Sequence, residues 1–149
     1  MPNTLTVRVQ GADTASLKFK YLIKAAQKGL ALSVPEAALL FQEEAKSIVP
    51  VDTGRLRDGI HTEQVTDELD RQVLMVTPVV EASNKEGFDP PYARRIEYGF
   101  VGADSLGRIY NQAAQPYMRP AFDSKSAEAT AVIKNGIIDA LDEAASLRR

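Results

Sequence analysis

The first residues to test for chemistry are Asp52-Thr53-Gly54, which follow an apolar stretch of the chain. An Asp-Thr-Gly tripeptide is typical of aspartic proteases, in which two such aspartates share a proton and activate water. That fold is nearly all β, however, and this tripeptide follows a long helical pattern. The cations of Arg55 and Arg57 would also keep Asp52 ionised. We therefore favour a turn in which Asp52 accepts backbone donors and Gly54 adopts a positive φ, and keep the protease as the enzymatic alternative.

The sequence contains few candidate residues for other kinds of catalysis. His61 is the only histidine, so a Ser-His-Asp triad would have to use it, and its pattern predicts an exposed strand residue. The segment from Gly102 to Gly107 fits neither the nucleophile elbow nor a Walker loop. Without cysteine, a transition-metal site would depend on carboxylates, and no acidic pair has a suitable spacing. We expect no catalytic residue, no metal site and no cofactor.

Composition places the chain in a broad class. Its 149 residues are 44% apolar and 26% charged, as in one globular domain spanning residues 1–149. The formal net charge of -2 offers no global attraction to DNA or anionic lipid, so at most transient contact with DNA is expected. The absence of cysteine and of a long apolar run predicts an intracellular protein without a membrane partner.

Helical periodicity dominates the first third of the chain after an alternating, strand-like segment at Thr4–Gln10. Asp13 is a suitable N-cap, and Pro50 ends the pattern. Ser33-Val34-Pro35-Glu36 looks like a capping box, which predicts a kink or a new helix at this point. The first helical stretch should bury one apolar face, made of Ala15, Phe19, Leu22, Ile23, Ala26 and Leu30, and should present Lys20, Lys24 and Lys28 to solvent.

Short strands and a last helix follow. Strands are expected at Ile60–Val65 and Arg71–Val80, the second central in its sheet, with a loop at Ala82–Pro91. Tyr92–Tyr98 predicts a short helix, and Gly99–Gln115 a surface excursion. A long helix with one apolar stripe begins at Pro120 and is slightly weakened by Gly136. The fold class is α+β: a long N-terminal helical segment and a C-terminal helix packed on a small, mainly antiparallel β-sheet.

Three short segments of the sequence, which we call islands, form a recognisable combination. The first is Ala45-Lys46 with the run from Pro50 to Arg57; the second is Tyr92-Ala93 with Ile96-Glu97-Tyr98-Gly99; the third is the run Gln115-Pro116-Tyr117-Met118-Arg119-Pro120-Ala121-Phe122. Their order and spacing resemble the neck and tail-completion family of long-tailed double-stranded DNA phages, often described as head-tail joining or minor tail proteins. The resemblance spans about residues 10 to 145. The link between Gly99 and Gln115 departs from it, because many relatives have a shorter one there.

The resemblance implies a non-enzymatic structural protein of a phage or prophage. Such a protein is assembled in the host cytoplasm and placed in the virion neck or tail, often as a ring. Its partners would be further copies of itself and neighbouring head-connector or tail-tube proteins. A tail-terminator subunit that caps the tail tube is the alternative within phages, and an adaptor unrelated to phages is a third interpretation.

The islands have physical interpretations of their own. The structural turn motif comprises Pro50, Asp52, Thr53, Gly54 and Leu56; the short-helix motif comprises Tyr92, Ala93, Glu97 and Gly99; the start of the C-terminal helix comprises Pro116, Met118, Arg119, Pro120 and Ala121. Leu56 should reach the core, Glu97 should pair with Arg94, and Met118 should plug an apolar gap beside Pro120.

A docking loop is expected between the second and third islands. Its apolar residues are Phe100, Val101, Leu106, Ile109 and Tyr110, which are too apolar for an idle loop, although they could instead fold back onto their own sheet. Residues 51–120 carry more acidic than basic groups. Glu63, Asp67, Glu68 and Asp70 are therefore candidates for an acidic channel lumen that passing DNA would not bind, and a solvated outer rim would have the same composition.

Overall fold

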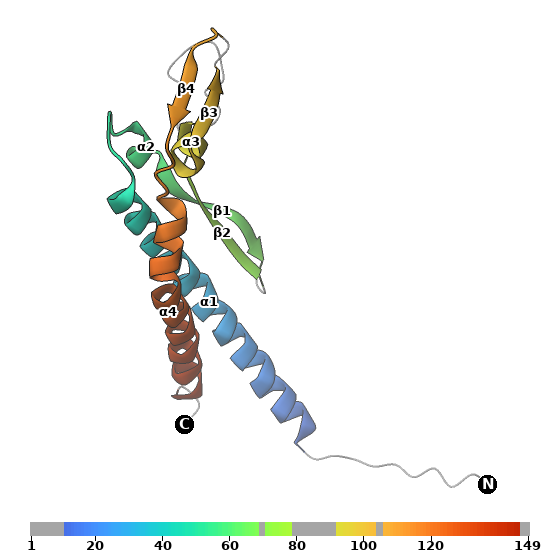
Figure 1. The fold of residues 1–149 in the computed structure, drawn as a ribbon. Helices are drawn as coiled ribbons and strands as arrows, with labels where there is room; N and C mark the ends of the chain where they lie inside the picture. Colours follow the sequence, from blue (N-terminus) through green and yellow to red (C-terminus); the bar gives the residue numbers. More distant parts are fainter. Residues whose placement is uncertain (1–10, 69–70, 79–91, 104–105, 147–149) are drawn as a thin grey trace, which may run out of the picture.

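Two long helices form the body of the protein, and two β-hairpins lie beside them (Figure 1). In the computed structural model, the structure describes residues 11–68, 71–78, 92–103 and 106–146. Helix α1 (Ala12–Ile48) has 37 residues and α4 (Met118–Ser146) has 29, and they pack against each other along most of α4. The α+β class is confirmed. The strand expected at Thr4–Gln10 and the loop at Ala82–Pro91 lie outside the described residues.

Helix α1 runs without interruption through the predicted break, so the expected restart at Ser33 is wrong. Pro35 lies inside the helix, and the Ser33 hydroxyl donates a hydrogen bond back to the Gly29 carbonyl at 2.8 Å rather than capping a new turn. Tertiary packing on both sides of this point overrides the local signal. The N-cap is Gly11, with φ 86°, and Asp13 instead lies in the first turn.

The two long helices approach most closely at a pair of glycines. A Cβ added to Gly29 would lie 2.5 Å from the Gly136 carbonyl oxygen, and one added to Gly136 would lie 2.6 Å from the Ser33 Cβ. Neither position can hold a larger side chain without the helices moving apart. Gly136 therefore allows the close approach of α1 and α4. The sequence predicted only that this glycine would slightly weaken the last helix.

A β-hairpin covers part of α1. Strands β1 (Ile60–Glu68) and β2 (Arg71–Pro78) pair antiparallel, with a register shift between Gln64 and Thr66. The sheet has only these two strands within the described residues, so the central position expected for the second strand is wrong. The Thr62 hydroxyl donates to the Gln42 Oε1 at 3.0 Å, which ties the hairpin to α1.

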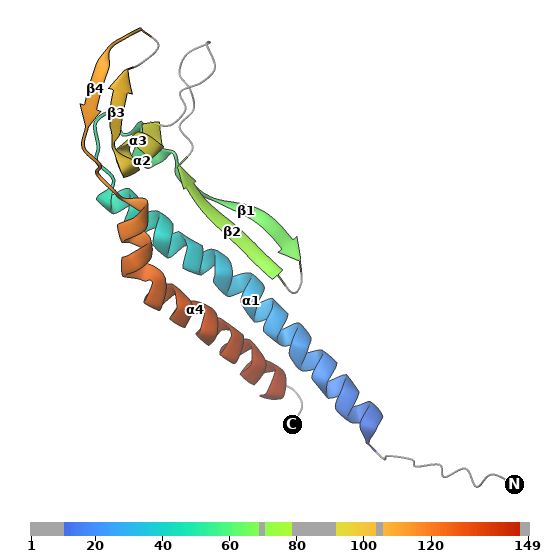
Figure 2. The same cartoon turned by 45° about the vertical axis from the view of Figure 1, so that its right-hand side comes forward.

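The segment from Gly99 to Gln115, expected as a surface excursion, contains a second hairpin. Strands β3 (Phe100–Ala103) and β4 (Ile109–Gln112) pair antiparallel, with Phe100 opposite Gln112 and Ala103 opposite Ile109. The hairpin projects from the end of the molecule that lies opposite the N-terminus of α1 (Figures 1 and 2). Its four-residue strands are too short for the period-2 pattern to stand out from the surrounding glycines.

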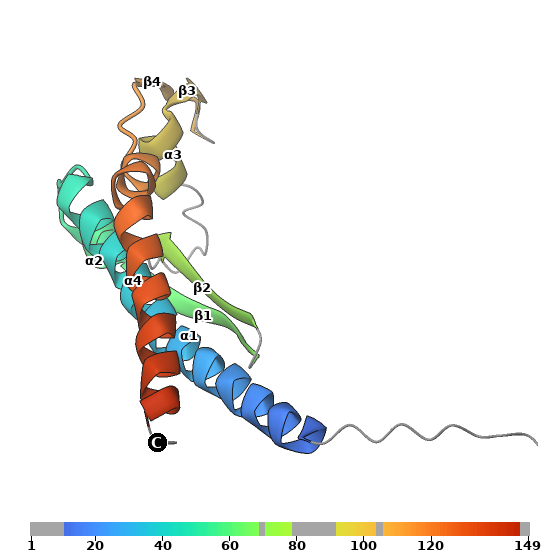
Figure 3. The same ribbon diagram turned by 90° about the horizontal axis from the view of Figure 1, so that it is seen from below.

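The N-terminal part of α1 extends beyond the end of α4 (Figure 3). Several of its apolar side chains are consequently exposed: Leu17 by 61%, Phe19 by 68% and Ile23 by 55%. The buried face expected for this part of the helix is therefore wrong in the single chain. This part of the chain is helical, as the periodicity predicts. Helix α4 and the β1–β2 hairpin cover the later part of α1 but end before they reach its N-terminal part.

Candidate functional site

The three sequence islands meet in one small core where α1 ends and α4 begins. Its buried residues come from all three islands or from positions within a few residues of them: Ala45 of α1 and Val49 just after it, Leu56 and Ile60 after the turn, Ile96 of α3 (Tyr92–Tyr98), Tyr117 just before α4, and Ala121 of α4. Val76, Ala93 and Met118 pack against this cluster. The expected core position of Leu56 is confirmed, and Met118, which was expected to plug an apolar gap, packs against the core while partly buried.

The turn island redirects the chain through a one-turn helix that the sequence pattern does not predict. Gly54 is buried with φ 82° and precedes α2 (Arg55–Asp58), where the Asp58 N–H donates to the Gly54 carbonyl at 2.9 Å. The positive φ expected at Gly54 is confirmed. Leu56 points into the core and is 3% exposed. Four residues give a helix too little periodicity to be recognised in sequence.

The other members of the turn island face solvent or lie at its margin. Asp52 and Thr53 are exposed, and Pro50 is half-buried. Among the described residues, no hydrogen-bond partner of the Asp52 carboxylate is seen, so the expected Asx-type arrangement is absent there. His61 is exposed on β1, as expected, with its Nδ1 3.0 Å from the Gly59 carbonyl oxygen.

Glu97 links the second island to the third. Its carboxylate accepts three backbone hydrogen bonds at the start of α4: Oε2 from the Tyr117 N–H at 2.7 Å and the Met118 N–H at 2.9 Å, and Oε1 from the Arg119 N–H at 3.1 Å. The residue is 8% exposed. A carboxylate at a helix N-terminus satisfies otherwise unpaired N–H groups and interacts favourably with the helix dipole.

This arrangement corrects the pairing expected for Glu97 with Arg94. The sequence contained one signal for it: the run Gln115-Pro116-Tyr117 before α4 has no Ser, Thr, Asp or Asn to act as an N-cap, so the helix needs an acceptor from elsewhere. The sequence alone does not reveal which residue provides this acceptor, because that depends on the tertiary fold. The helix also begins at Met118, two residues before the start expected at Pro120.

Tyr117 is the largest fully buried side chain in this core, 1% exposed. Burial, with a smaller effect from the nearby Glu97 charge, raises the pKa of its hydroxyl to about 12. Both effects disfavour a tyrosinate beside the Glu97 carboxylate. Ala121, in the first turn of α4, is also 1% exposed and completes this side of the core.

Gly99 allows two backbone segments to pass closely. It has φ 76°, and a Cβ there would lie 2.8 Å from the Gln112 carbonyl oxygen and 2.9 Å from the Ala114 nitrogen. The Gln115 N–H then donates to the Ile96 carbonyl at 2.7 Å. These contacts fix the segment that leads into α4 against α3. The remaining island residues are peripheral: Pro116 and Arg119 are exposed, Pro120 is half-buried, and the Tyr92 side chain lies outside the described residues.

The expected docking residues divide between two faces of the β3–β4 hairpin. Phe100 and Tyr110 lie on the inner face with their ring centroids 6.3 Å apart, and the Arg95 guanidinium lies 4.2 Å from the Phe100 centroid. Val101 and Ile109 lie on the outer face and are 78% and 86% exposed, while Leu106, near the tip, is 76% exposed. Phe100 and Tyr110 therefore fold back toward the protein, whereas Val101 and Ile109 point outward.

Only one of the four residues expected to line an acidic lumen has a side chain that the structure describes. Glu63 is exposed on β1, whereas the side chains of Asp67 and Glu68, and all of Asp70, lie outside the described residues, so the acidic lumen stays a prediction. Within the part of the chain that the structure describes, no cluster of His, Cys, Asp or Glu could hold a metal ion. No helix among those residues is long and apolar enough to cross a bilayer.

Comparisons of this chain with models of protein families, with curated proteins and with solved structures found no match. The geometry itself defines the site: a core that joins three separated sequence islands, held by a buried carboxylate, next to a hairpin with an exposed apolar face.

Proposed function

We propose that this protein is a non-enzymatic structural component of a phage or prophage head-tail junction, which works by self-association and by docking to neighbouring virion proteins. The proposal begins from the resemblance of the three islands to the neck and tail-completion family. It places the chain in the virion neck or tail after assembly in the host cytoplasm, with the head connector or the tail tube as its neighbour.

One observation supports the proposal most strongly: residues from all three islands share a single core. Ala45, Ile96 and Tyr117 come from different islands, yet all belong to the same buried cluster. A chance similarity of three short motifs would not require them to meet in space. The motif residues also have packing and capping roles, as with Leu56 in the core and Glu97 at the start of α4.

The outer face of the β3–β4 hairpin is the surface that we assign to the neighbouring virion protein. Val101, Ile109 and Leu106 expose large apolar side chains on an element that projects from the body. Apolar groups of this kind, gathered on one projecting element, are typical of protein interaction sites. The inner face, where Phe100 lies near Tyr110 and Arg95, holds the hairpin in place.

Completion of virus particles in a lysate that lacks this protein tests the proposal. Added wild-type protein should restore infectious particles, whereas a Val101→Ser/Ile109→Ser double variant should not. Val65→Ser provides a matched control because Val65 is also an exposed apolar strand residue, on β1 instead of the hairpin. Failure of the wild-type protein to restore particles would overturn the junction role, and restoration by the double variant would remove the hairpin as the docking surface.

The protease alternative has its own test. Peptide cleavage by the wild-type protein that disappears in Asp52→Asn would replace the structural role by an enzymatic one. The expected result is that neither protein cleaves a peptide library at about pH 2 to 5, roughly the range over which the aspartate dyad of pepsin holds one proton.

A further inference from the structure

An apolar face on the N-terminal half of α1 is left open in the single chain, and we call it the open face. Its residues follow a helical spacing and share one side of α1: Ala15, Phe19, Leu22, Ile23, Ala26 and Leu30. By the 100° step per residue, they span about 100° of the helix surface. Phe19 is 68% exposed and Ile23 is 55% exposed, whereas Ala26 and Leu30 are half-buried. Apolar side chains gathered in this way are typical of a surface that another protein covers.

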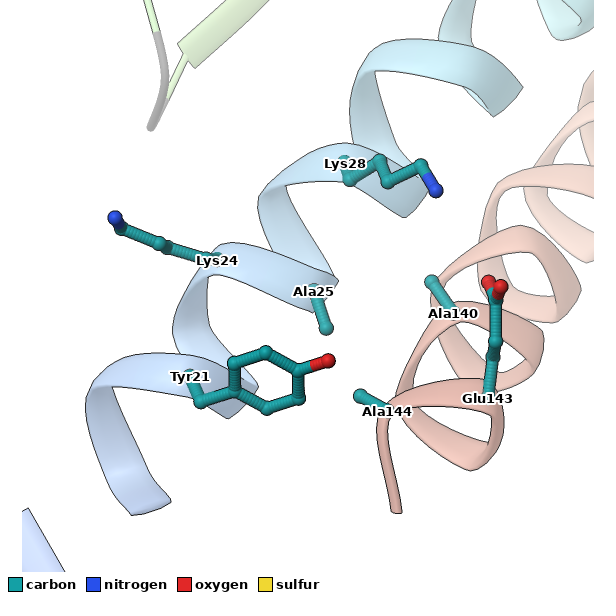
Figure 4. Close-up of a pocket in the computed structure, with 7 residues that line it drawn as sticks. All are labelled: Tyr21, Lys24, Ala25, Lys28, Ala140, Glu143 and Ala144. Atoms are coloured by element: carbon teal, nitrogen blue, oxygen red, sulfur yellow. The ribbon is translucent and has the colours of Figure 1, made fainter. Parts of the chain in front are cut away.

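Helix α4 covers a different side of α1. Figure 4 shows Tyr21 and Ala25 on the side of α1 that faces Ala140 and Ala144 of α4. By the helical step, Tyr21 and Ala25 lie about 110° to 150° from the centre of the open face. The contact between the two long helices therefore leaves the open face available for another partner.

The open face carries no charge. The nearest charged residue of α1, Lys18, lies about 90° from the centre of the face by the helical step. Lys20, Lys24 and Lys28 lie still further round the helix. A second copy of the chain brings an equally uncharged face, and the lysines of the two copies then remain on the outer sides of the pair, so no like charges are brought together.

The spacing of the open face is the same in both directions along the helix. Its centre lies between Leu22 and Ile23, and the other four residues lie in pairs at equal distances on either side: Phe19 with Ala26, and Ala15 with Leu30. Each of these pairs joins a large side chain and a small one. A second helix that runs in the opposite direction therefore places a small side chain at the level of each large one outside the centre. The open face is thus complementary to itself in an antiparallel pair.

We propose that two copies of this chain pair antiparallel through their open faces, with the two-fold axis between Leu22 and Ile23. The aliphatic side chains of these two residues from both copies form the centre of the contact. Phe19 of each copy packs against Ala26 of the other. The face that the helical periodicity predicts to be buried is then covered by the second copy. Because a two-fold contact closes on itself, the pair does not build a ring, and it does not depend on the proposed role at the head-tail junction.

The length of the contact fits the rest of the molecule. From Ala15 to Leu30 the open face is about 22 Å long. Helix α1 of the second copy begins at Ala12, which in this register lies at the level of Ser33, where α4 approaches α1 through Gly136. The second helix therefore ends where α4 takes over this side of α1. A helix pair of this length is at the lower end of specific interfaces in area, so dimerisation at micromolar concentration is expected.

A second copy fits this surface better than a lipid membrane does. Lysines on one side of a helix and large apolar side chains on the other also suit a helix that lies on a membrane. A flat bilayer would contact Phe19 and Ile23, but Ala26 and Leu30 are half-buried beside α4, where the narrow surface of a helix reaches them and a bilayer does not. A membrane also gives no reason for large and small residues to be placed symmetrically about one point.

Sedimentation velocity of the full chain tests the pairing. The wild-type protein should sediment as a dimer at micromolar concentration. Ile23→Ser should weaken self-association at least about tenfold, because it places a hydroxyl in the centre of the buried contact. Leu17→Ser is the matched control and should leave the dimer unchanged, since Leu17 is 61% exposed but lies about 170° from the centre of the open face. Circular dichroism checks that both variants remain folded.

Cysteine cross-linking tests the direction of the pairing. The chain has no cysteine, so Ala15→Cys and Leu30→Cys each carry a single thiol. In the antiparallel register, position 15 of one copy lies at the level of position 30 of the other, whereas like positions are about 22 Å apart along the helix, too far for a disulfide. An oxidised equimolar mixture should give a disulfide-linked dimer with one copy of each variant, and either variant alone should give none.

Several outcomes would overturn the pairing. A wild-type monomer would mean that the open face is not covered by a second copy. Self-association that Ile23→Ser leaves unchanged would place the contact elsewhere on the molecule. A disulfide-linked dimer of either cysteine variant alone would indicate parallel pairing, and the absence of the mixed dimer would exclude the antiparallel register. Wild-type monomer that binds vesicles containing phosphatidylserine, with binding lost in Ile23→Ser, would assign the face to a lipid surface.

Discussion

The Glu97 carboxylate and the Tyr117 backbone N–H meet at 2.7 Å, twenty residues apart in the chain and both inside the core. The hydrogen bond joins the end of α3 to the start of α4, with the whole β3–β4 hairpin between them. A charged acceptor in this position is more strongly hydrogen-bonded than a neutral one would be. The hairpin is thereby held at its base by a contact that does not involve its own residues.

Replacing Glu97 should destabilise the whole domain. Glu97→Ala leaves three N–H groups at the start of α4 without their acceptor, and we expect a loss of about 3 kcal/mol in the free energy of unfolding, measured by urea denaturation. Glu97→Gln keeps one carbonyl oxygen and loses the charge, so about half that loss is expected. Glu128→Gln, at an exposed position on α4, is the control and should change stability by less than about 0.5 kcal/mol. Equal stability of Glu97→Ala and wild type would show that water replaces the cap.

Tyr117 predicts a loss of stability at high pH. Its pKa is raised to about 12 by burial and by Glu97, whereas in the unfolded chain it is near 10. Between these values the unfolded state has released the proton and the folded state still holds it, so the free energy of unfolding falls as pH rises. Over two pKa units the loss reaches about 2.7 kcal/mol. Tyr117→Phe should lose less stability than wild type between pH 10 and pH 12 in urea denaturation.

A positive φ at Gly54 predicts a specific pattern of substitutions. Gly54→Ala should cost about 1 kcal/mol or more, because the Cβ has space, with its nearest neighbour 3.6 Å away at Asp58, but the backbone conformation is unfavourable for it. Gly54→Asn should cost less, since asparagine tolerates the left-handed region. Denaturant midpoints of the two variants compare them directly. Equal midpoints for Gly54→Ala and wild type would mean that the turn relaxes to a negative φ.

Sequence patterns predicted the elements whose signals are local. The positive φ of Gly54, the short helix at Tyr92–Tyr98 and the two strands after Ile60 all follow from residue types within a few positions. The features that the sequence did not reveal depend on distant partners. The Glu97 cap needs α4 beside α3, and the exposure of Phe19 depends on where α4 ends. Among the site residues, Leu56 and Met118 were placed correctly from hydrophobicity, and Glu97 was given the wrong partner.

Pro35 shows how packing overrides a local helix signal, and its removal should stabilise the protein. Its side chain is exposed, so Pro35→Ala loses little packing, while it restores a backbone N–H inside α1. The gain expected is about 1 to 3 kcal/mol, with part of the helical advantage offset by a more flexible unfolded chain. Thermal denaturation followed by circular dichroism measures it. A lower melting temperature would mean that the proline is needed for the packing of α1.

The glycine crossing between α1 and α4 predicts a rescue between two substitutions. Gly136→Ala should destabilise by about 1 to 3 kcal/mol despite the better helix propensity of alanine, because its Cβ would lie 2.6 Å from the Ser33 Cβ. Ser33→Gly alone should also destabilise, since it loses the hydrogen bond to the Gly29 carbonyl and weakens the helix. In the double variant, Ser33→Gly removes the side chain that the new Cβ at position 136 would meet, and the next contact, with the Gly29 oxygen at 3.5 Å, is ordinary. The double variant should therefore be more stable than the sum of the single losses by at least about 1 kcal/mol. Strictly additive losses in urea denaturation would show that the helices simply separate at this point and that the glycines do not set their distance.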